Sequence, residues 1–600
     1  MLYYNPLDEF CKNPTGAVKE NEEVVFRIKC NSNKCALVIT KDGSNCSCHH
    51  EMIKKDGYFE ISLYIDVGLY WYYFDMCNGE FVGKGENFLG ELSRYPQGFQ
   101  LTVSKSNYCV PSWLKGGIIY QIFPDRFCRA EKKKKVSDEK VLHAKWGETP
   151  IYQPNHAGQV LNNDFFGGDF KGIIKKLPYL KKLNVTAIYL NPIFKAYSNH
   201  RYDTGDYMTI DPLLGTEDDF KDLIAKTDEL GIKIILDGVF NHSGDDSLYF
   251  NRYGRYDSKG AYQCADSKYK NWFKFTDYPK EYESWWGIRT LPAYNKTCPE
   301  LVDFITGENG VIEKYTKMGI GGWRLDVVDE LPSSMVKKIR SAVKKVNQDG
   351  IVIGEVWEDA SNKISYGVRR EYFLGDELDS VMNYPLKNAI INLVTTGETT
   401  QFVQVVSELV DHYPKAVLDS LMNILSTHDT YRILSSISGI NTAGLNKKSM
   451  ENLTVSGVQL ETAKTKLKMA TLLQFTVFGV PSIYYGDEVG MQGFADPLNR
   501  RCYPWRKGDA EILSWYRKLS KIRSRYSAFA DGKFKLLYGK NGAVVYSRSN
   551  DESEVLVSVN AGDTVKVVSF DGKLYNVLNG KYYESNFELL PNSFAIFVRK

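Results

Sequence analysis

Eight short apolar segments, separated by stretches with helical periodicity, dominate the middle of this 600-residue chain. The periodicity is clearest at 216–230 and 333–346, where apolar residues return every three or four positions. Alternating strands and helices predict a closed (β/α)8 TIM barrel, because parallel strands need crossover helices between them. The strands are expected at 118–123, 187–192, 232–239, 321–327, 351–357, 378–384, 423–429 and 481–488.

The flanks of the barrel have a different pattern. Short β-rich runs with Asp-Gly and Asn-Gly turns predict β-sandwiches at both ends of the chain. Between two barrel strands, about sixty residues rich in Tyr, Trp, Lys and Asp are too many for a loop, which indicates an inserted subdomain after strand three. The expected domains are an N-terminal β-sandwich at 1–112, the barrel at 113–242 and 302–525, the inserted subdomain at 243–301, and a C-terminal β-sandwich at 526–600.

Composition is that of an ordinary globular protein, with 43% hydrophobic and 25% charged residues and a net charge of +3. A near-balanced charge gives no general reason to bind nucleic acid or an anionic membrane. The basic run 132–135 is interpreted as a solvated loop. The aromatic share of 13%, with 40 Tyr and 10 Trp, suits a surface that stacks on sugar rings, although large β-rich cores produce the same excess.

Targeting signals are not recognised. The first nine residues lack the basic and apolar regions of a secretory signal, so we expect a cytoplasmic location. The most apolar stretch, 469–486, contains Gln474 and Pro481 and is predicted to be a buried helix followed by a buried strand, not a membrane span.

The eleven cysteines indicate free thiols in a reducing compartment, because their number is odd and no signal peptide is expected. A local cluster does not have the usual zinc spacing, and its cysteines are interpreted as small apolar residues on strands. The cluster is Cys30, Cys35, Cys46, Cys48, His49 and His50.

Three carboxylates stand where predicted strands end: Asp326, Glu355 and Asp429. The carboxyl ends of barrel strands open at one face, so these side chains are expected to share one mouth. Paired carboxylates suit glycoside hydrolysis, in which one attacks and another, its pKa raised by like-charge crowding, donates a proton. A salt bridge explains any one of these acids equally well, but all three beside His, Arg or Trp favour catalysis.

The sequence around these acids resembles the four motif regions of the α-amylase family, glycoside hydrolase family 13. All four occur in order at the expected strand ends, and the resemblance covers about 400 residues. Together with the N-terminal β domain, it is similar to the neopullulanase, cyclomaltodextrinase and maltogenic amylase subgroup, whose members carry a starch-binding-type module there. The four segments are Asp237-Gly238-Val239-Phe240-Asn241-His242, Trp323-Arg324-Leu325-Asp326, Gly354-Glu355-Val356-Trp357 and Thr427-His428-Asp429.

The resemblance implies a role for each acid. Asp326 is the expected nucleophile, which forms a covalent glycosyl intermediate, and Glu355 is the expected general acid and then base. Asp429 is expected to stabilise the distorted transition state through sugar hydroxyls. Arg324 lies two residues before Asp326 on the same strand face and is expected to keep it ionised.

The resemblance also implies substrate-binding residues. His242 and His428 are expected to donate hydrogen bonds in the −1 subsite, Tyr202 to stack beneath that sugar, and Trp357 to line the leaving-group side. For Tyr202 taken alone, a surface-loop position is an equal reading, and the same holds for Asp496. The remaining implied residues are His200 for substrate binding, Asp496 and Arg500 in a loop that closes the non-reducing side, and Asp237 as a supporting acid.

A calcium site of the subgroup is altered here. Relatives place Asn and Asp after the segment that corresponds to 123–127, but this chain reads Cys128-Arg129-Ala130-Glu131-Lys132. Basic residues cannot replace hard oxygen ligands, although Gly167 and Asp169 match the second half of that site. We therefore expect no cofactor to be required and no metal ligand in the active site, with a bound calcium ion as the less favoured alternative.

The sequence predicts a retaining hydrolase of α-1,4-glucosidic bonds in maltooligosaccharides, cyclodextrins, pullulan or starch, with transglycosylation as a further activity. Bond preference stays open, because the segment 291–295 lacks the Lys of the usual Met-Pro-Lys-Leu-Asn. Alternatives are an α-1,6-glucosidase, a trehalose-type transferase or a non-catalytic glucan-binding protein. The expected partners are α-glucan oligosaccharides, with no nucleic acid and no membrane.

A homodimer through the N-terminal domain is a further prediction from the resemblance. The aromatic run Trp71-Tyr72-Tyr73-Phe74 fits either such an interface or a core strand of the sandwich.

Overall fold

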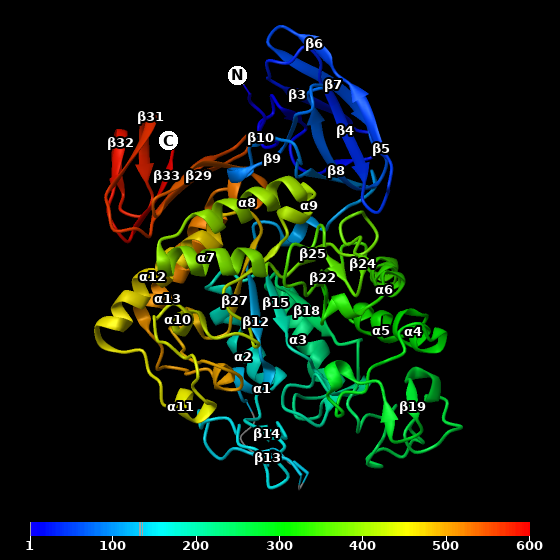
Figure 1. Ribbon diagram of the computed structural model, residues 1–600. Coiled ribbons are helices and arrows are strands. Elements are labelled where there is room, and N and C mark those ends of the chain that lie inside the picture. The colour runs from blue at the N-terminus through cyan, green and yellow to red at the C-terminus, as the bar shows by residue number, and fades with distance from the viewer. Residues whose placement is uncertain (1, 131–133, 135, 138, 600) are drawn as a thin grey trace.

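The structure is a computed structural model that describes residues 2–130, 134, 136–137 and 139–599 (Figure 1). Its centre is a sheet of parallel strands in the order β25-β22-β21-β18-β15-β12-β27-β26. A parallel bridge between Met382 and Met422 closes this sheet, so the predicted (β/α)8 barrel is confirmed. The strands are β12 (Ile119–Ile122), β15 (Ala187–Leu190), β18 (Lys233–Gly238), β21 (Gly322–Leu325), β22 (Ile351–Gly354), β25 (Ser380–Val381), β26 (Met422–Ile424) and β27 (Val480–Tyr484).

The two-residue period of the strands creates two cores. In β22, Ile351 and Ile353 belong to a cluster inside the barrel, whereas Val352 packs in the larger cluster beneath the helices. Most strands end earlier than the sequence suggested. In 423–429, for example, only the first two residues belong to β26, because the later ones leave the ladder and carry polar side chains into the mouth.

Helices surround the barrel (Figure 1). The two helices predicted from periodicity are α3 (Glu217–Glu229), which begins with a capping box between Thr216 and Asp219, and α6 (Ser333–Val346). The apolar stretch 469–486 forms the end of α12 and then β27, as predicted. The others are α1 (Pro124–Phe127), α2 (Phe170–Lys181), α4 (Pro299–Thr306), α5 (Val311–Lys317), α7 (Tyr384–Thr396), α8 (Thr400–His412), α9 (Lys415–Leu418), α10 (Ile433–Ser436), α11 (Lys447–Glu451), α12 (Gly457–Thr476), α13 (Ala510–Arg525) and α14 (Ala528–Asp531).

None of the helices in the described part of the chain combines the length and the apolarity that crossing a bilayer requires.

Long connections build the mouth of the barrel. The segment after β18 carries β19 (Phe275–Asp277) and β20 (Glu281–Tyr282) and packs around Tyr249, Phe250 and Trp272. A second long connection, between β12 and α2, carries β13 (Val141–Leu142) and β14 (Asp164–Phe165). The sequence pattern anticipated only the first, since the second is polar and contains no extended apolar run. Two hairpins also rise here: β16 (Phe194–Ala196) with β17 (Thr204–Ile210), and β23 (Ile364–Ser365) with β24 (Val368–Arg369).

The interpretation of 132–135 as a solvated loop is wrong for Lys134. Its side chain is 8% exposed and its ammonium lies 3.0 Å from the Asp169 carboxylate. Lys132, Lys133 and Lys135 lie outside the described residues.

The N-terminal domain is a β-sandwich, as predicted. A four-stranded sheet in the order β1-β3-β7-β6 packs against a larger sheet formed by the remaining strands. Tyr72 and Phe74 lie in the core between the sheets, whereas the Trp71 indole donates to Asp42 at 2.8 Å. The strands are β1 (Lys12–Asn13), β2 (Val18–Lys19), β3 (Glu23–Ile28), β4 (Ala36–Lys41), β5 (Ser47–Glu51), β6 (Ile53–Lys55), β7 (Tyr58–Tyr64), β8 (Gly68–Asp75), β9 (Phe81–Lys84), β10 (Gly90–Ser93) and β11 (Phe99–Ser104).

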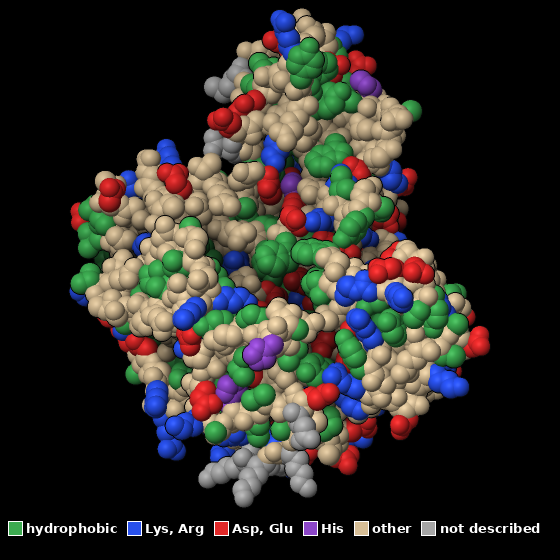
Figure 2. Space-filling view, turned by 60° about the horizontal axis from the view of Figure 1, so that its bottom comes forward, with side chains coloured by type: hydrophobic (Ala, Val, Ile, Leu, Met, Phe, Trp, Pro, Cys, Tyr) green, Lys and Arg blue, Asp and Glu red, His purple; other side chains and the backbone are tan. Residues whose placement is uncertain are grey.

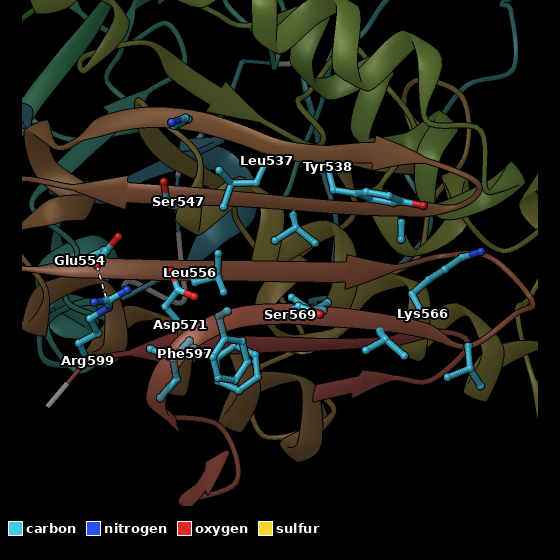
Figure 3. Close-up of a pocket in the computed structure, with 18 residues that line it drawn as sticks. Leu537, Tyr538, Ser547, Glu554, Leu556, Lys566, Ser569, Asp571, Phe597 and Arg599 are labelled. Atoms are coloured by element: carbon cyan, nitrogen blue, oxygen red, sulfur yellow. Dashed lines mark ion pairs between the residues drawn. The ribbon is translucent and has the colours of Figure 1, made fainter. Parts of the chain in front are cut away.

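The C-terminal domain is one antiparallel sheet in the order β28-β29-β30-β33-β31-β32. The β31–β32 hairpin folds back, so that Val568 and Leu589 pack on Val545 and give the domain two layers. A pocket remains between the layers, with Leu556 and Phe597 in its lining (Figure 3). The strands are β28 (Lys533–Lys540), β29 (Ala543–Ser549), β30 (Glu554–Asn560), β31 (Lys566–Asn576), β32 (Lys581–Leu589) and β33 (Ser593–Val598).

The cysteines are all free thiols. Cys35 is buried, but Cys46 and Cys48 are exposed, so the interpretation as apolar strand residues is wrong for these two. Within the described ranges, no group of three or more His, Cys, Asp or Glu residues is arranged to hold a metal ion.

An ion pair between Lys12 and Asp411 of α8 joins the N-terminal sandwich to the barrel. Both side chains are fully buried. Removing only one partner leaves an uncompensated charge away from water, which is costly. The pair therefore contributes to the docking of the sandwich on the barrel, together with the Lys84–Glu408 and Asp42–Arg369 ion pairs.

We predict that Lys12→Met destabilises the protein by about 3–5 kcal/mol, measured by denaturant unfolding. Lys221→Met is the control, because its pair with Glu217 is about half exposed and is expected to contribute less than about 1 kcal/mol. An equal effect of both substitutions would contradict the importance of the buried pair.

Candidate active site

A single arginine holds the acids at the mouth of the barrel together. Arg324 is fully buried, and its Nη1 lies 2.8 Å from both Asp237 Oδ1 and Asp326 Oδ1. Its Nη2 lies 2.7 Å from Glu355 Oε2. Three carboxylates from three strand ends thus converge on one guanidinium.

The barrel ladder creates this convergence. Asp237 of β18 pairs in register with Arg324 of β21, so their side chains point to the same side. The next residues continue the ladder, as Asp326 N–H donates to Gly238 O at 3.1 Å and Glu355 N–H to Leu325 O at 3.0 Å. Figure 2 shows a hollow near the centre of one face of the molecule, with acidic side chains in its depth.

Glu355 is fixed by two donors besides Arg324. Val327 N–H donates to its Oε2 at 2.9 Å, and the Trp357 indole donates to its Oε1 at 3.2 Å. Val327 has a φ of 37°, a left-handed conformation that is strained for a β-branched residue. Such strain is typical of functional sites, where the surrounding structure enforces it.

Trp357 lies beside the acids. In addition to its hydrogen bond to Glu355, it stacks on a second aromatic residue. One ring face stacks on Tyr384 at 4.1 Å between centroids, and the side chain is about half exposed. The rest of the side chain is open to solvent.

Asp429 and the predicted Asp496–Arg500 pair form the opposite side. Arg500 Nη2 lies 3.3 Å from Asp429 Oδ1, and its Nη1 lies 3.0 Å from Asp496 Oδ1. Arg500 also donates from Nε to His428 O at 2.9 Å. The structure therefore brings Asp429, Arg500 and Asp496 together, with the Arg500 guanidinium between the two carboxylates.

Tyr202 connects the two sides. Its hydroxyl lies 2.8 Å from Asp237 Oδ2 and 2.6 Å from His428 Nε2, and it accepts from Asn191 Nδ2 at 2.9 Å. Its ring stacks on His428 with 4° between planes. A sugar in the mouth would meet this aromatic wall.

Both site histidines are neutral, because burial lowers their pKa values, to about 3 for His242 and well below the usual range for His428. Neighbouring amides donate to Nδ1 of each ring, from Gln121 to His428 at 3.0 Å and from Asn241 to His242 at 3.1 Å. The proton is therefore on Nε2 of each ring.

Within the described residues, the buried Nε2 atom of His242 has no well-formed hydrogen bond. It is positioned as a donor for a ligand hydroxyl.

His200 lies one step behind the site. Its Nδ1 accepts from the Tyr202 backbone N–H at 3.1 Å, so it orders the loop that carries Tyr202. Burial lowers its pKa well below the usual range and keeps it neutral.

Burial dominates the electrostatics of the acids. It raises the pKa of Asp326 well above its usual range, with Arg324 opposing and Glu355 adding to the rise. Burial also raises the pKa of Asp429 to about 7, again with a contribution from Glu355. The raised pKa of Asp326 runs against the expectation that Arg324 keeps this carboxyl ionised, because burial of the side chain outweighs the arginine beside it.

Several residues of the site escaped the sequence analysis. Tyr189 donates to Asp237 Oδ2 at 2.6 Å, and Lys296 donates to Asn241 Oδ1 at 2.7 Å. Trp285 stacks on His242 at 5.1 Å. Tyr189 could have been found from the sequence, because it is a bulky residue with a polar hydroxyl inside a predicted barrel strand. Lys296 and Trp285 lie in the inserted segment, where the sequence has no periodicity. The sequence analysis also missed Gln121, which donates to His428, and Tyr384, which stacks on Trp357.

In the altered calcium region, the positive charge beside the carboxylate comes from a lysine side chain. The Lys134 ammonium lies beside the Asp169 carboxylate and bonds the Leu213 carbonyl. Asp125, on the other side of this region, accepts from the backbone N–H groups of Phe166 and Gly167 and pairs with Arg126. These protein donors satisfy oxygens of the type that a calcium ion prefers.

The pocket of the C-terminal domain is separate from this site. Its lining comes from the C-terminal strands and includes the Glu554–Arg599 ion pair at one end (Figure 3). None of the residues predicted to be catalytic lies in it.

A closed (β/α)8 barrel with a carboxylate cluster at its mouth, flanked by two β domains, defines the class of this protein. Comparison with known proteins agrees: the family described as the alpha amylase catalytic domain matches residues 121–527, more than half of the chain. The chain belongs to the alpha-amylase family.

Three known proteins show which members of the family this chain is similar to. The chain is 34% identical to an amylopullulanase of Thermoanaerobacter thermohydrosulfuricus, over 97% of this chain and 45% of that relative. It is 33% identical to a cyclomaltodextrinase of a Bacillus species, over 76% of this chain and 75% of the relative. A solved cyclomaltodextrinase structure covers 99% of each chain, with a TM-score of 0.69 and 25% identity. The chain spans less than half the length of the amylopullulanases that it matches.

We predict that Asp429→Asn raises the melting temperature at pH 8 and that this gain disappears near pH 4. The pKa of Asp429 is raised in the folded state, so the stability that its proton confers is fully present below about 4 and is lost as the pH rises through about 7. An amide does not ionise. Melting temperatures of both proteins across this pH range provide the test, and a pH-independent difference would contradict the raised pKa.

We also predict that EDTA changes neither the melting temperature nor the activity, because Lys134 supplies the positive charge beside Asp169. The matched comparison is the protein with added CaCl2. Loss of activity and melting temperature on chelation, restored by Ca²⁺, would contradict this.

Proposed function

We propose that this protein is a retaining glycoside hydrolase that cleaves α-1,4-glucosidic bonds of short α-glucans, cyclodextrins and pullulan. The observation that carries the proposal is the shared contact of Asp326 and Glu355 with the two terminal nitrogens of Arg324. Shared contact with one guanidinium keeps the two carboxyl groups next to each other, as the double-displacement mechanism of retaining enzymes needs. The names of the relatives, cyclomaltodextrinase and amylopullulanase, support this choice of substrate class.

In the first step, Asp326 attacks the anomeric carbon while Glu355 protonates the glycosidic oxygen. The bond from the anomeric carbon to that oxygen breaks, and a glycosyl ester forms on Asp326. Arg324 and Val327 hold Glu355 Oε2, so Oε1, whose contact is the Trp357 indole N–H, is the oxygen that carries the proton.

In the second step, Glu355 removes a proton from water, and the water oxygen attacks the anomeric carbon from the opposite face. The ester bond breaks, Asp326 becomes a carboxylate again, and the product retains the α configuration. A sugar hydroxyl in place of water gives transglycosylation by the same route.

Binding of the reacting sugar falls to the neutral donors around it. His242 Nε2 has no well-formed hydrogen bond in the described part of the chain and is available to donate to a hydroxyl. Tyr202 and His428 form a stacked aromatic wall, and Asp429 with Arg500 offers an acceptor and a donor on the other side. Hydrogen bonds that strengthen as the ring distorts would lower the barrier.

A product profile tests the substrate class. The protein is incubated separately with maltoheptaose, β-cyclodextrin, pullulan and isomaltose, and the products are separated by chromatography. We expect maltose with glucose from the first two and panose from pullulan. Glucose from isomaltose alone would favour an α-1,6-glucosidase, and no product from any substrate would favour a glucan-binding protein.

We predict that two substitutions separate the roles of the acids. Asp326→Asn abolishes turnover of every substrate, because an amide cannot form the ester, while oligosaccharide binding persists. Glu355→Gln lowers kcat on maltoheptaose by about 10²–10⁴-fold but retains activity on α-maltosyl fluoride, whose leaving group needs no proton. Near-normal kcat in Asp326→Asn, or equal losses of Glu355→Gln on both substrates, would contradict the assignment.

Two proposals concern the whole molecule. A homodimer through the N-terminal domain is consistent with the remaining exposed surface of that sandwich, although Trp71 is engaged within the chain. A cytoplasmic location is proposed together with a role in degrading imported oligosaccharides.

A further inference from the structure

The pocket of the C-terminal domain has the size of a ligand site. Its volume is about 650 Å³, within the range of roughly 300–1,000 Å³ that is typical of small-molecule pockets. Leu556 of β30 and Phe597 of β33 line it from the central strands, together with Val545 of β29 (Figure 3). The start of β31 covers it with Val568 and Phe570. The two layers therefore leave a space that their own side chains do not fill.

An irregularity in β28 aims side chains into this space. Leu536 pairs with Tyr546 and Tyr538 pairs with Val545, so Leu537 is an extra residue in the strand. As a result of this β-bulge, the consecutive side chains of Leu537 and Tyr538 both line the pocket. Bulges that redirect side chains in this way are common beside functional sites.

A second irregularity bends β31 over the pocket. Its segment 569–573 contains five residues but lies opposite only the three residues 584–586 of β32. Gly572 has a φ of 77°, a conformation that glycine adopts without strain, and it permits the bend. Phe570 then packs on Phe597 with ring centroids 5.7 Å apart. The cover of the pocket is thus held in place by a contact at its inner end.

Three aliphatic side chains stand exposed around the rim of the pocket. Leu537 and Val565 are each 50% exposed, and Val567 is 63% exposed. Single exposed apolar residues are normal at a protein surface, but a group of them around one cavity marks an interaction site. Aliphatic walls favour a hydrocarbon chain over a sugar, because sugar hydroxyls lose water on burial and need hydrogen-bond partners in return.

The charged groups that line the pocket are unevenly distributed. At one end, Glu554 and Arg599 form an ion pair at 3.2 Å, and Asp571 and Lys535 add one charge of each sign to the same half (Figure 3). Lys566 stands at the other end and makes no ion pair with any described residue that lines the pocket (Figure 3). One end is therefore balanced in charge, whereas the other presents an ammonium group to an anion.

We infer that this pocket binds a long-chain carboxylate, with its hydrocarbon chain between the two layers and its carboxylate at Lys566. Burial of the chain against Leu556 and Phe597 supplies the affinity, and a charge-assisted hydrogen bond from the ammonium selects the head group. The pocket contains none of the residues of the proposed active site, so this inference does not rest on the proposed function.

The test is calorimetric titration of the full chain with decanoate and, separately, with decanol, which has the same number of carbons but no charge. Lys566→Gln removes the ammonium, and Leu537→Glu places a carboxylate at the rim. Leu590→Glu is the matched control, because Leu590 is 54% exposed in the same domain and does not line the pocket. Melting temperatures show whether each variant folds.

We expect the native chain and Leu590→Glu to bind decanoate equally. Lys566→Gln should weaken decanoate binding by about tenfold and leave decanol binding unchanged, whereas Leu537→Glu should weaken the binding of both by about tenfold. A native dissociation constant for decanoate weaker than about 1 mM, or equal affinity in the native chain and both pocket variants, would overturn the inference. An equal loss of decanoate and decanol in Lys566→Gln would overturn the assignment of the carboxylate to Lys566.

A competition experiment separates the pocket from the barrel mouth. It uses the Asp326→Asn chain, which is expected to bind maltoheptaose without cleaving it. Saturating maltoheptaose should leave the affinity for decanoate unchanged. Displacement of decanoate by the sugar would overturn the inference, whether or not the native chain proves to be a hydrolase.

Discussion

The buried guanidinium of Arg324 is the interaction on which the rest of the site depends. A charge this far from water is stable only when it is paired, and it is paired with Asp237, Asp326 and Glu355 from three strand ends. Those acids in turn need the arginine, because their mutual repulsion and burial disfavour ionisation. Closure of the barrel brings the four side chains together, so fold and chemistry are specified by the same strand register.

Several features around Arg324 lower the stability of the folded protein but suit the binding of a ligand. Val327 is held in a left-handed conformation, the buried Nε2 of His242 lacks a well-formed hydrogen bond to the described residues, and Asp429, whose side chain is 34% exposed at the mouth, has a pKa raised to about 7. Each feature costs free energy in the empty protein and is relieved or used when a sugar binds.

Sequence alone predicts what regular periodicity encodes. Alternating strands and helices predicted the barrel, and strand-end motifs predicted that residues as distant as Asp237 and Asp429 lie together. Irregular segments carry no such signal, so the long β12–α2 connection and the ring stack through Trp285 were missed. Lys134 shows why: its basic neighbours indicated a solvated loop, but burial beside Asp169 is a tertiary contact that local sequence does not encode.

The most direct test of the central claim is to trap the covalent intermediate. The native protein would be treated with a 5-fluoro-α-glucosyl fluoride, which forms the ester and hydrolyses slowly, then digested and analysed by peptide mass spectrometry. The account predicts one added glycosyl group, on the carboxylate of Asp326. A label on Glu355 or Asp429, or a β-configured product released without any label, would contradict it.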